Sequence, residues 1–245
     1  WERAEFPMEI ALKLKDLGVI GGMIRGHGSA GLDPLAMGLV MYELSKGDGS
    51  ITTFYGVHSG LAMGAIGLLG SDEQRERWLP AMSRLETIGA FALTEPERGS
   101  AAVDLQTTAR RDGDSYILNG AKRWIGNATL AGVLVVWARD EEGGVGAFVI
   151  ENPSQVEGVQ MSVIEGKIGK RGVLNADIKL TNVRVPAENR LAKSRTFKDA
   201  GKVLVLGRYG VAWEAAGVAT GAFELALEYA KSREQFGKPI AGFQL

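Results

Sequence analysis

The sequence predicts an α+β protein in which helices flank a central β-rich region. Helical periodicity dominates residues 1–90, short β-branched runs separated by turn residues fill 91–195, and helical periodicity returns over 196–245. Because no helical stretch separates the short strands, we expect them to form an antiparallel barrel or sandwich. The predicted domains are therefore an N-terminal helical domain, 1–90, a central β domain, 91–195, and the first part of a C-terminal helical domain, 196–245.

The composition is that of a globular chain. It has 245 residues, 45% of them hydrophobic, and a formal net charge of -1, which gives no reason to expect nucleic-acid binding. The absence of cysteine excludes disulfides, a thiol nucleophile and Cys-ligated metals. No acidic cluster accompanies His27 or His58, so we expect no metal site.

We expect neither a membrane span nor a signal peptide. The most apolar long run, 60–70, is too short to cross a bilayer. We therefore expect a cytoplasmic protein, or one of the mitochondrial matrix or peroxisome if the source is eukaryotic.

Start and stop signals divide the first 90 residues into helices. Asp33 followed by Pro34 predicts an N-cap and a first helical position, with the helix fading near Gly47. The run 51–69 predicts a helix of small apolar residues that is buried on most sides.

Two further sequence patterns occur in the first 90 residues. Ser71 and Gln74 have the spacing of a capping box, and Pro80 is expected to bend or end the helix that follows. The stretch 26–31 matches G-x-G-x-x-G, but Arg25 and His27 interrupt the apolar strand that a dinucleotide site needs. We interpret it as a glycine-rich turn between helices.

The central region contains several strand signals. The run 116–118 ends at Asn119-Gly120, which predicts a hairpin turn. Further strands are expected at 133–138, 145–150, 159–163 and 176–183.

The last helical stretch has one continuous apolar face. Its residues are Val211, Ala215, Val218, Ala219, Ala222, Leu225, Ala226 and Tyr229. Four glycines each weaken the helix by about 1 kcal/mol, so we expect close packing of another backbone as compensation. They are Gly207, Gly210, Gly217 and Gly221. The helix should stop before Gly237, and the absence of a following partner suggests an incomplete domain or a covering chain.

Phe91–Ser100 and the segment around Trp124 have the residue types of a cofactor site. Thr94 offers a hydroxyl, Gly99 permits close approach of a ligand to the backbone, and Ser100 adds a second hydroxyl. The large flat ring of Trp124 lies beside small residues, which suits stacking on a planar group.

Four ordered motifs carry a family resemblance. The motifs are ALTEPERGS, NGAKRWIGN, RYGVAW and SREQFGKPIAGFQL. They resemble motifs of the acyl-CoA dehydrogenase and acyl-CoA oxidase family, notably of glutaryl-CoA dehydrogenase and short-chain acyl-CoA oxidase. The resemblance implies helical, β and four-helix domains, of which only the start of the last is present. It also implies a homotetramer, FAD, an acyl-CoA substrate and electron-transferring flavoprotein as an electron acceptor.

The implied reaction is α,β-dehydrogenation: a base removes the α-proton of the thioester and a β-hydride passes to flavin N5. The resemblance places at the cofactor Phe91, Ala92, Leu93, Thr94, Gly99, Ser100, Trp124, Ile125, Gly126, Arg233, Gln235 and Gln244. Arg233 and Gln235 match residues that reach the pyrophosphate of a neighbouring subunit, and Gln244 matches a residue at the adenine half. It places Ser100, Thr52 and Arg208 at the substrate, with Arg208 holding the CoA moiety.

Three departures from the family pattern narrow these expectations. Gly126 replaces the usual Thr, which leaves oxygen and electron-transferring flavoprotein both open as acceptors. Thr52 replaces the Arg that grips a distal carboxylate, so a short or branched monocarboxylyl substrate is favoured over glutaryl-CoA unless Arg25 or Lys46 reaches the pocket.

The third departure concerns the catalytic base, for which no residue is named. Gly207 stands where a minority of the family carry Glu, and Glu214 lies about two turns further on. We expect the base in a C-terminal part that this chain lacks.

Four alternatives to a short-chain or branched acyl-CoA dehydrogenase remain open. They are a glutaryl-CoA dehydrogenase, an oxygen-using acyl-CoA oxidase, a non-catalytic FAD-binding remnant, and a flavin monooxygenase or nitroalkane-oxidase relative.

Overall fold

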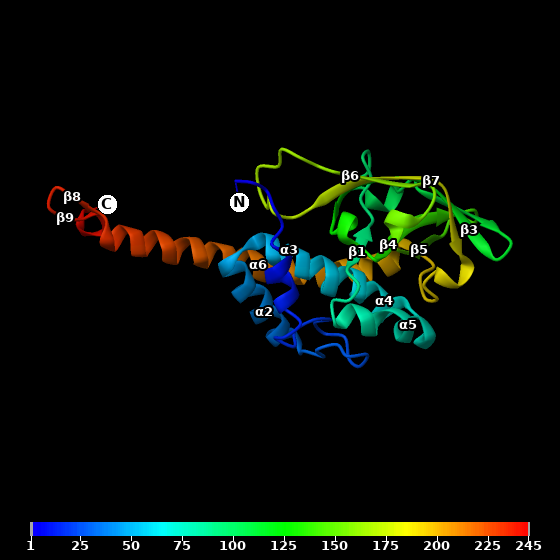
Figure 1. The fold of residues 1–245 in the computed structure, drawn as a ribbon, viewed down its shortest axis with the longest axis horizontal. Helices are drawn as coiled ribbons and strands as arrows, with labels where there is room; N and C mark the ends of the chain where they lie inside the picture. The colour runs from blue at the N-terminus through cyan, green and yellow to red at the C-terminus, as the bar shows by residue number, and fades with distance from the viewer. Residues whose placement is uncertain (1, 245) are drawn as a thin grey trace.

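The computed structural model describes residues 2–244 and shows a helical layer packed against a curled β-sheet (Figure 1). One long helix runs along the helical layer and projects beyond it. Before the sheet come α1 (Met8–Lys13), α2 (Pro34–Gly47), α3 (Gly49–Tyr55), the π-helix η1 (Gly56–Ala62), α4 (Met63–Leu69) and α5 (Asp72–Ser83). In the part of the chain that the structure describes, no helix has both the length and the apolar character to cross a membrane.

The strands are β1 (Gly89–Ala92), β2 (Thr108–Asp112), β3 (Ser115–Gly126), β4 (Val133–Asp140), β5 (Val145–Glu151), β6 (Val159–Val163) and β7 (Asn175–Pro186). The long helix is α6 (Phe197–Ser232), followed by the short strands β8 (Glu234–Gln235) and β9 (Lys238–Pro239). Short 3-10 turns are η2 (Ala102–Asp104), η3 (Ala128–Leu130), η4 (Pro153–Gln155), η5 (Ala187–Asn189) and η6 (Ile240–Gly242).

The predicted helix starts are confirmed. The Asp33 carboxylate accepts a hydrogen bond from the Ala36 amide at 2.9 Å, with Pro at the first helical position. Ser71 and Gln74 form the capping box. Pro80 does not end the helix, because it lies inside α5. Burial of the neighbouring apolar side chains against the core offsets the cost of the missing helical hydrogen bond.

The glycine-rich stretch 26–31 is a turn between α1 and α2, as interpreted from the sequence. Gly26, Gly28 and Gly31 have φ values of 81°, 76° and 63°, which side chains with a Cβ rarely adopt. The predicted helix at 51–69 is also present, built from α3, η1 and α4 in succession.

The larger sheet has the order β1-β4-β2-β3-β7-β6, with β5 also paired to β4. β4 pairs in parallel with β1 and β2, and the other pairings are antiparallel. The hairpin predicted at Asn119-Gly120 is wrong, because β3 runs through it and the chain reverses at 113–114. Gly120 instead permits close packing, since a Cβ there would lie 2.5 Å from Thr107 Oγ1.

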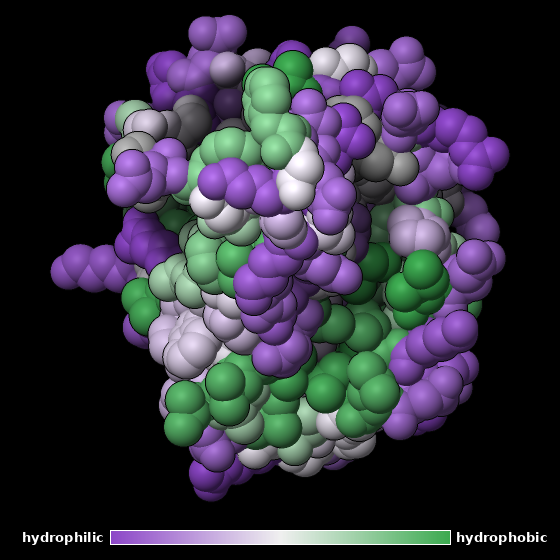
Figure 2. Space-filling model, turned by 90° about the vertical axis from the view of Figure 1, so that its left-hand side faces the viewer, coloured by the Kyte–Doolittle hydropathy of each residue, from purple (hydrophilic) through white to green (hydrophobic). Residues whose placement is uncertain are grey.

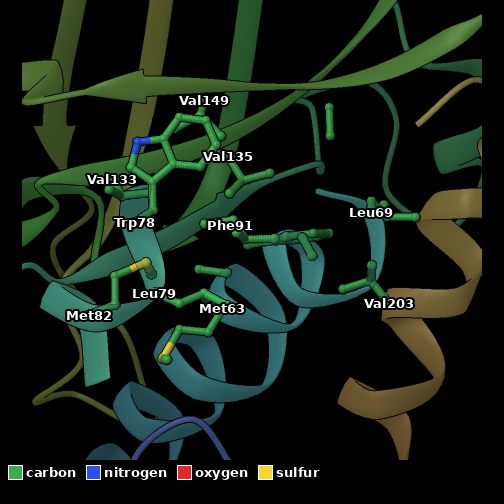
Figure 3. Packing of buried hydrophobic residues seen from close by; sticks show 14 of the residues in the cluster. Met63, Leu69, Trp78, Leu79, Met82, Phe91, Val133, Val135, Val149 and Val203 are labelled. Atoms are coloured by element: carbon green, nitrogen blue, oxygen red, sulfur yellow. The ribbon is translucent and has the colours of Figure 1, made fainter. Parts of the chain in front are cut away.

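The sheet buries one face against the helices (Figure 3). Phe91, Val133, Val135 and Val149 from the strands belong to the same buried cluster as Met63, Trp78, Leu79 and Met82 from the helices. A second apolar cluster, formed mainly by β-region residues, includes Leu134, Phe148, Ile178 and Val183. The helical layer therefore fixes the position of β1, which leads into the first predicted cofactor segment.

Helix α6 packs on α2 through its glycines. A Cβ at Gly217 would lie 2.3 Å from the Tyr42 carbonyl oxygen, and one at Gly221 would lie 2.6 Å from that of Lys46. The expectation of close backbone packing is confirmed at these two positions. Much of the predicted apolar face of α6 is exposed, including Val211, Val218, Leu225 and Tyr229. Figure 2 looks onto the end from which α6 projects and shows apolar residues gathered on that side of the molecule.

His58 joins three elements inside the core. Its Nδ1 accepts a hydrogen bond from the Gly89 amide at 2.8 Å, and its Nε2 lies 3.1 Å from the Met82 carbonyl oxygen. Since Nδ1 accepts, Nε2 carries the proton and donates. The ring therefore ties η1 to the end of α5 and to the start of β1. Burial lowers the pKa of His58 to about 4, against the opposing effect of the Met82 hydrogen bond.

We predict that acidification destabilises the fold through His58. Between pH 6.5 and about 4 the unfolded chain binds a proton that the folded chain does not, so stability present above pH 6.5 is lost as the pH falls towards 4. The loss is on the order of 3 kcal/mol. Urea unfolding of the native chain and of His58→Asn across this range measures it. An equally steep pH dependence in both proteins would contradict the assignment.

Candidate functional site

The two predicted cofactor segments meet where β1 and β3 end. The Arg123 amide donates a hydrogen bond to the Thr94 carbonyl at 2.9 Å. Thr94 is half-buried, and Trp124, the next residue of β3, has an exposed ring. The structure therefore brings Thr94 against Arg123, the residue before Trp124, although the two segments are far apart in sequence.

A buried ion pair between Lys122 and Glu95 joins the two predicted cofactor segments on their core side. Lys122 is fully buried, and its Nζ lies 3.0 Å from Glu95 Oε1 and 3.1 Å from the Leu93 carbonyl oxygen. Glu95 also accepts from the Thr107 hydroxyl at 2.5 Å, the Thr107 amide at 2.9 Å and the Gln106 amide at 2.6 Å. Each charge thus has the partners that burial demands.

The pKa shifts of this pair follow from burial and pairing. Burial lowers the pKa of Lys122 to about 8, although Glu95 opposes the shift. Burial raises the pKa of Glu95, but the charge of Lys122 and the hydrogen-bond donors outweigh it, so that pKa lies below its usual value. The Glu95 carboxylate therefore stays ionised at neutral pH.

Trp124 is held in a conformation that is unusual for an aromatic residue. Its φ is +63°, in the left-handed region, and its side chain is half exposed. The Arg123 guanidinium lies 5.2 Å from the ring centroid, and Asn175 Nδ2 donates to the Trp124 carbonyl at 3.1 Å. A strained residue with an exposed ring at a strand end is typical of a functional site.

Gly126 and Asn127 lock this strand end to the helical layer. A Cβ at Gly126 would lie 3.3 Å from Val57 Cγ2, so the close approach of η1 suits glycine here. Asn127 Nδ2 donates to the carbonyls of Phe54 at 3.1 Å and Gly89 at 3.3 Å. The absence of a side chain at position 126 therefore has a packing reason in this chain.

The remaining predicted cofactor residues of the two segments fall into two groups. Phe91, Ala92, Leu93 and Ile125 are buried in the core, so their side chains are not exposed to a ligand. Gly99 and Ser100 are exposed, and no atom lies within 4 Å of a Cβ built at Gly99. The predicted cofactor residues of these segments that remain accessible to a ligand are therefore Thr94, Gly99, Ser100 and Trp124.

A small groove of about 110 Å³ runs between α3–η1 and α6. These elements are antiparallel, since Gly207 packs against Leu61 near one end and Glu214 reaches Thr53 near the other. The two α6 residues are about 10 Å apart along the axis at 1.5 Å per residue. Apart from two charged side chains, Lys170 and Glu214, the groove is lined by Gly, Thr and apolar residues.

The two charged side chains form an ion pair. The Glu214 carboxylate is buried and pairs with Lys170 Nζ, which reaches in from the loop between β6 and β7. Thr53 Oγ1 lies 3.4 Å from the same carboxylate oxygen. Lys170 itself remains half exposed.

The other predicted substrate residues are arranged unevenly. Thr52 lines the groove, but its hydroxyl donates to the Asp48 carbonyl at 3.1 Å and lies 3.2 Å from Ser45 Oγ. Arg208 is exposed on α6, one residue from Gly207. Lys46 pairs with Glu224 at 3.1 Å rather than entering the groove, and Arg25 lines a neighbouring cavity of about 330 Å³.

The structure does not bring the C-terminal candidates to this site. Arg233, Gln235 and Gln244 are exposed and lie beyond the projecting end of α6 (Figure 1). Within this chain they are remote from Thr94 and Trp124.

Sequence reasoning missed the Lys122–Glu95 pair and the position of Lys170. Lys122 and Glu95 stand in the two motif segments, so their opposite charges were an available signal. Lys170 lies in an irregular loop, and nothing in its local sequence indicates that it reaches Glu214. Glu214 does carry a signal, since it is an acid among small apolar residues of a helix.

The chain matches domains of one family along nearly its whole length. Residues 1–86 match the N-terminal domain of acyl-CoA dehydrogenases, 90–183 the middle domain and 197–245 the C-terminal domain. A 3-(aryl)acrylate reductase of Clostridium sporogenes is 40% identical over 98% of this chain and 65% of its own length. The human mitochondrial short-chain specific acyl-CoA dehydrogenase is 36% identical over 98% of this chain and 59% of its own length.

Solved structures give the same result. A glutaryl-CoA dehydrogenase from Mycobacterium smegmatis in complex with FADH2 matches 99% of this chain and 62% of its own, at 36% identity and a TM-score of 0.94. Butyryl-CoA dehydrogenase from Megasphaera elsdenii matches 99% of this chain and 65% of its own, at 33% identity and a TM-score of 0.91. This chain thus spans less than two thirds of the length of these relatives, and it belongs to the acyl-CoA dehydrogenase family.

Proposed function

We propose that this chain binds FAD and an acyl-CoA thioester within an enzyme that dehydrogenates short-chain or branched acyl groups between Cα and Cβ. The observation that carries the proposal is an exposed, strained Trp124 at the end of a strand whose next residues pack on the groove, since Gly126 lies against Val57 and Val57 lines the groove. The short-chain and butyryl-CoA dehydrogenases among the relatives support the same class of reaction.

The accessible residues fit a flavin. The exposed ring of Trp124 offers a flat apolar surface, the half-buried Thr94 offers a hydroxyl, and Gly99 and Ser100 leave room for a phosphate. FAD, when bound, supplies the acceptor for the hydride that leaves the β-carbon. The chain's own residues bind and orient it, with the buried core behind β1 and β3 keeping the two segments fixed.

Arg233, Gln235 and Gln244 are proposed to bind the FAD of a neighbouring subunit. They are exposed at the projecting end of α6, and a guanidinium suits a pyrophosphate. The exposed apolar face of α6 is then buried inside the proposed homotetramer.

The groove suits a small acyl group. Its volume of about 110 Å³ is well below that of pockets for drug-sized ligands, about 300–1,000 Å³. A short alkyl chain would pack against Thr53, with the fully buried Thr52 behind it, while exposed Arg208 and Ser100 would hold the CoA moiety. An aryl group, as in the name of the C. sporogenes relative, would need more room.

We propose that the base that removes the proton is not Glu214, the acid of this groove. Gly207 has no side chain to offer, and the Glu214 carboxylate is held by Lys170 and Thr53. For the electron acceptor we propose electron-transferring flavoprotein, because a relative with 39% identity is a subunit of a caffeyl-CoA reductase–Etf complex.

The first test concerns Trp124. Trp124→Ala removes the exposed ring while leaving the core beneath it, so FAD content after gel filtration should fall and the flavin absorption bands should shift. Val163→Ala, which truncates an exposed apolar side chain on β6, is the control and should leave both unchanged. Normal FAD content and spectrum in Trp124→Ala would show that this ring does not contact the flavin.

The second test concerns the substrate. The groove offers a distal carboxylate only neutral hydroxyls and a lysine that is already paired, and an unpaired buried carboxylate costs several kcal/mol. We expect butyryl- or isobutyryl-CoA to exceed glutaryl-CoA in kcat/KM by at least about tenfold. Steady-state kinetics of the protein carrying this chain, with a dye acceptor, measures the ratio. Equal or better turnover of glutaryl-CoA would refute the substrate class.

A further inference from the structure

The end of the groove contains a charge that a binding site for alkyl chains does not need. Glu214 is 5% exposed and lies on the inner face of α6, where its helix neighbours Gly210 and Gly217 are also buried. Burying a carboxylate is costly unless a cation or several donors accompany it. We therefore infer that a charged Glu214 at the end of the groove affects which ligand binds there.

The partner of Glu214 is held in place by its own loop. Lys170 has φ +46°, and its carbonyl accepts from Lys167 Nζ at 3.0 Å. Lys167 Nζ also donates to the Val173 carbonyl and, at 2.6 Å, to Asn175 Oδ1. Asn175 in turn donates to the Trp124 carbonyl, so the loop that delivers Lys170 is tied to the proposed flavin site.

Among the residues that line the groove in the described part of the chain, Lys170 is the one cation. A dicarboxylyl thioester would have to place its distal carboxylate beside such a cation. Glu214 occupies that place and neutralises Lys170. A second carboxylate at this end would meet the negative charge of Glu214 and no free cation.

We propose that Glu214 is a built-in counterion that occupies the position of a distal substrate carboxylate, so that the Lys170–Glu214 pair excludes dicarboxylyl thioesters and selects monocarboxylyl ones. The inference rests on the proposed acyl-CoA dehydrogenase function and assigns its substrate selectivity to one pair of side chains. Glu214 is a specificity-determining residue here and takes no part in proton transfer.

The test compares Glu214→Ala, with and without Lys170→Ala, on two substrates. Glu214→Ala frees Lys170 and opens space, so the glutaryl-CoA to butyryl-CoA ratio of kcat/KM should rise at least about tenfold. Lys170→Ala added to Glu214→Ala removes the freed cation and should abolish the gain. Glu224→Ala is the matched control, because Glu224 lies on the same helix and pairs with Lys46 outside the groove. It should leave the ratio unchanged.

Binding measurements keep the test decisive. Calorimetric titration of each variant with glutaryl-CoA and butyryl-CoA should show that the ratio of the two affinities changes in the same variants and in the same direction. If Glu214→Ala does not fold, Glu214→Gln keeps the shape and removes the charge, and it should still raise the ratio. A ratio that stays constant in both Glu214 variants, while the unsubstituted protein turns over butyryl-CoA, overturns this inference alone. Failure of the unsubstituted protein to bind either thioester overturns the proposed function and this inference together.

Discussion

The site depends on one buried ion pair, Lys122 with Glu95. It joins the end of β1 to β3 beneath the surface on which Thr94 and Trp124 lie. The pair is fully satisfied, because Glu95 also accepts from Gln106 and Thr107. Such a pair adds little net stability compared with apolar residues, but losing one partner leaves an uncompensated charge in the core. It therefore acts mainly by fixing the geometry of the two segments relative to each other.

The helical layer attaches this strand end to the elements that line the groove. His58 and Asn127 attach β1 and the end of β3 to η1 and α3, and the same helices form one wall of the groove. The opposite wall is α6, whose glycines at 217 and 221 bring it against α2. The proposed flavin surface is thus attached to one wall of the acyl groove, and the Lys170 loop connects them again through Asn175.

The sequence predicts the helix–sheet–helix order and the two cofactor segments because these depend on local signals. Caps at Asp33 and Ser71 act within one turn and are confirmed. The hairpin at Asn119-Gly120 is wrong because glycine serves two purposes, and here Gly120 makes room for Thr107 rather than turning the chain. The Lys170–Glu214 pair could not be predicted, since it links a loop to a helix 44 residues later through the tertiary fold alone.

The role of the Lys122–Glu95 pair in organising the site is tested most directly by the FAD dissociation constant of Lys122→Met. This variant removes the cation beneath the two segments and leaves Glu95 ionised in the core. We predict a loss of unfolding free energy of about 3–5 kcal/mol and an FAD affinity at least about tenfold weaker. Lys179→Met, at an exposed position on β7, should change neither. A folded Lys122→Met protein that binds FAD as tightly as the native one would show that the pair does not organise the site.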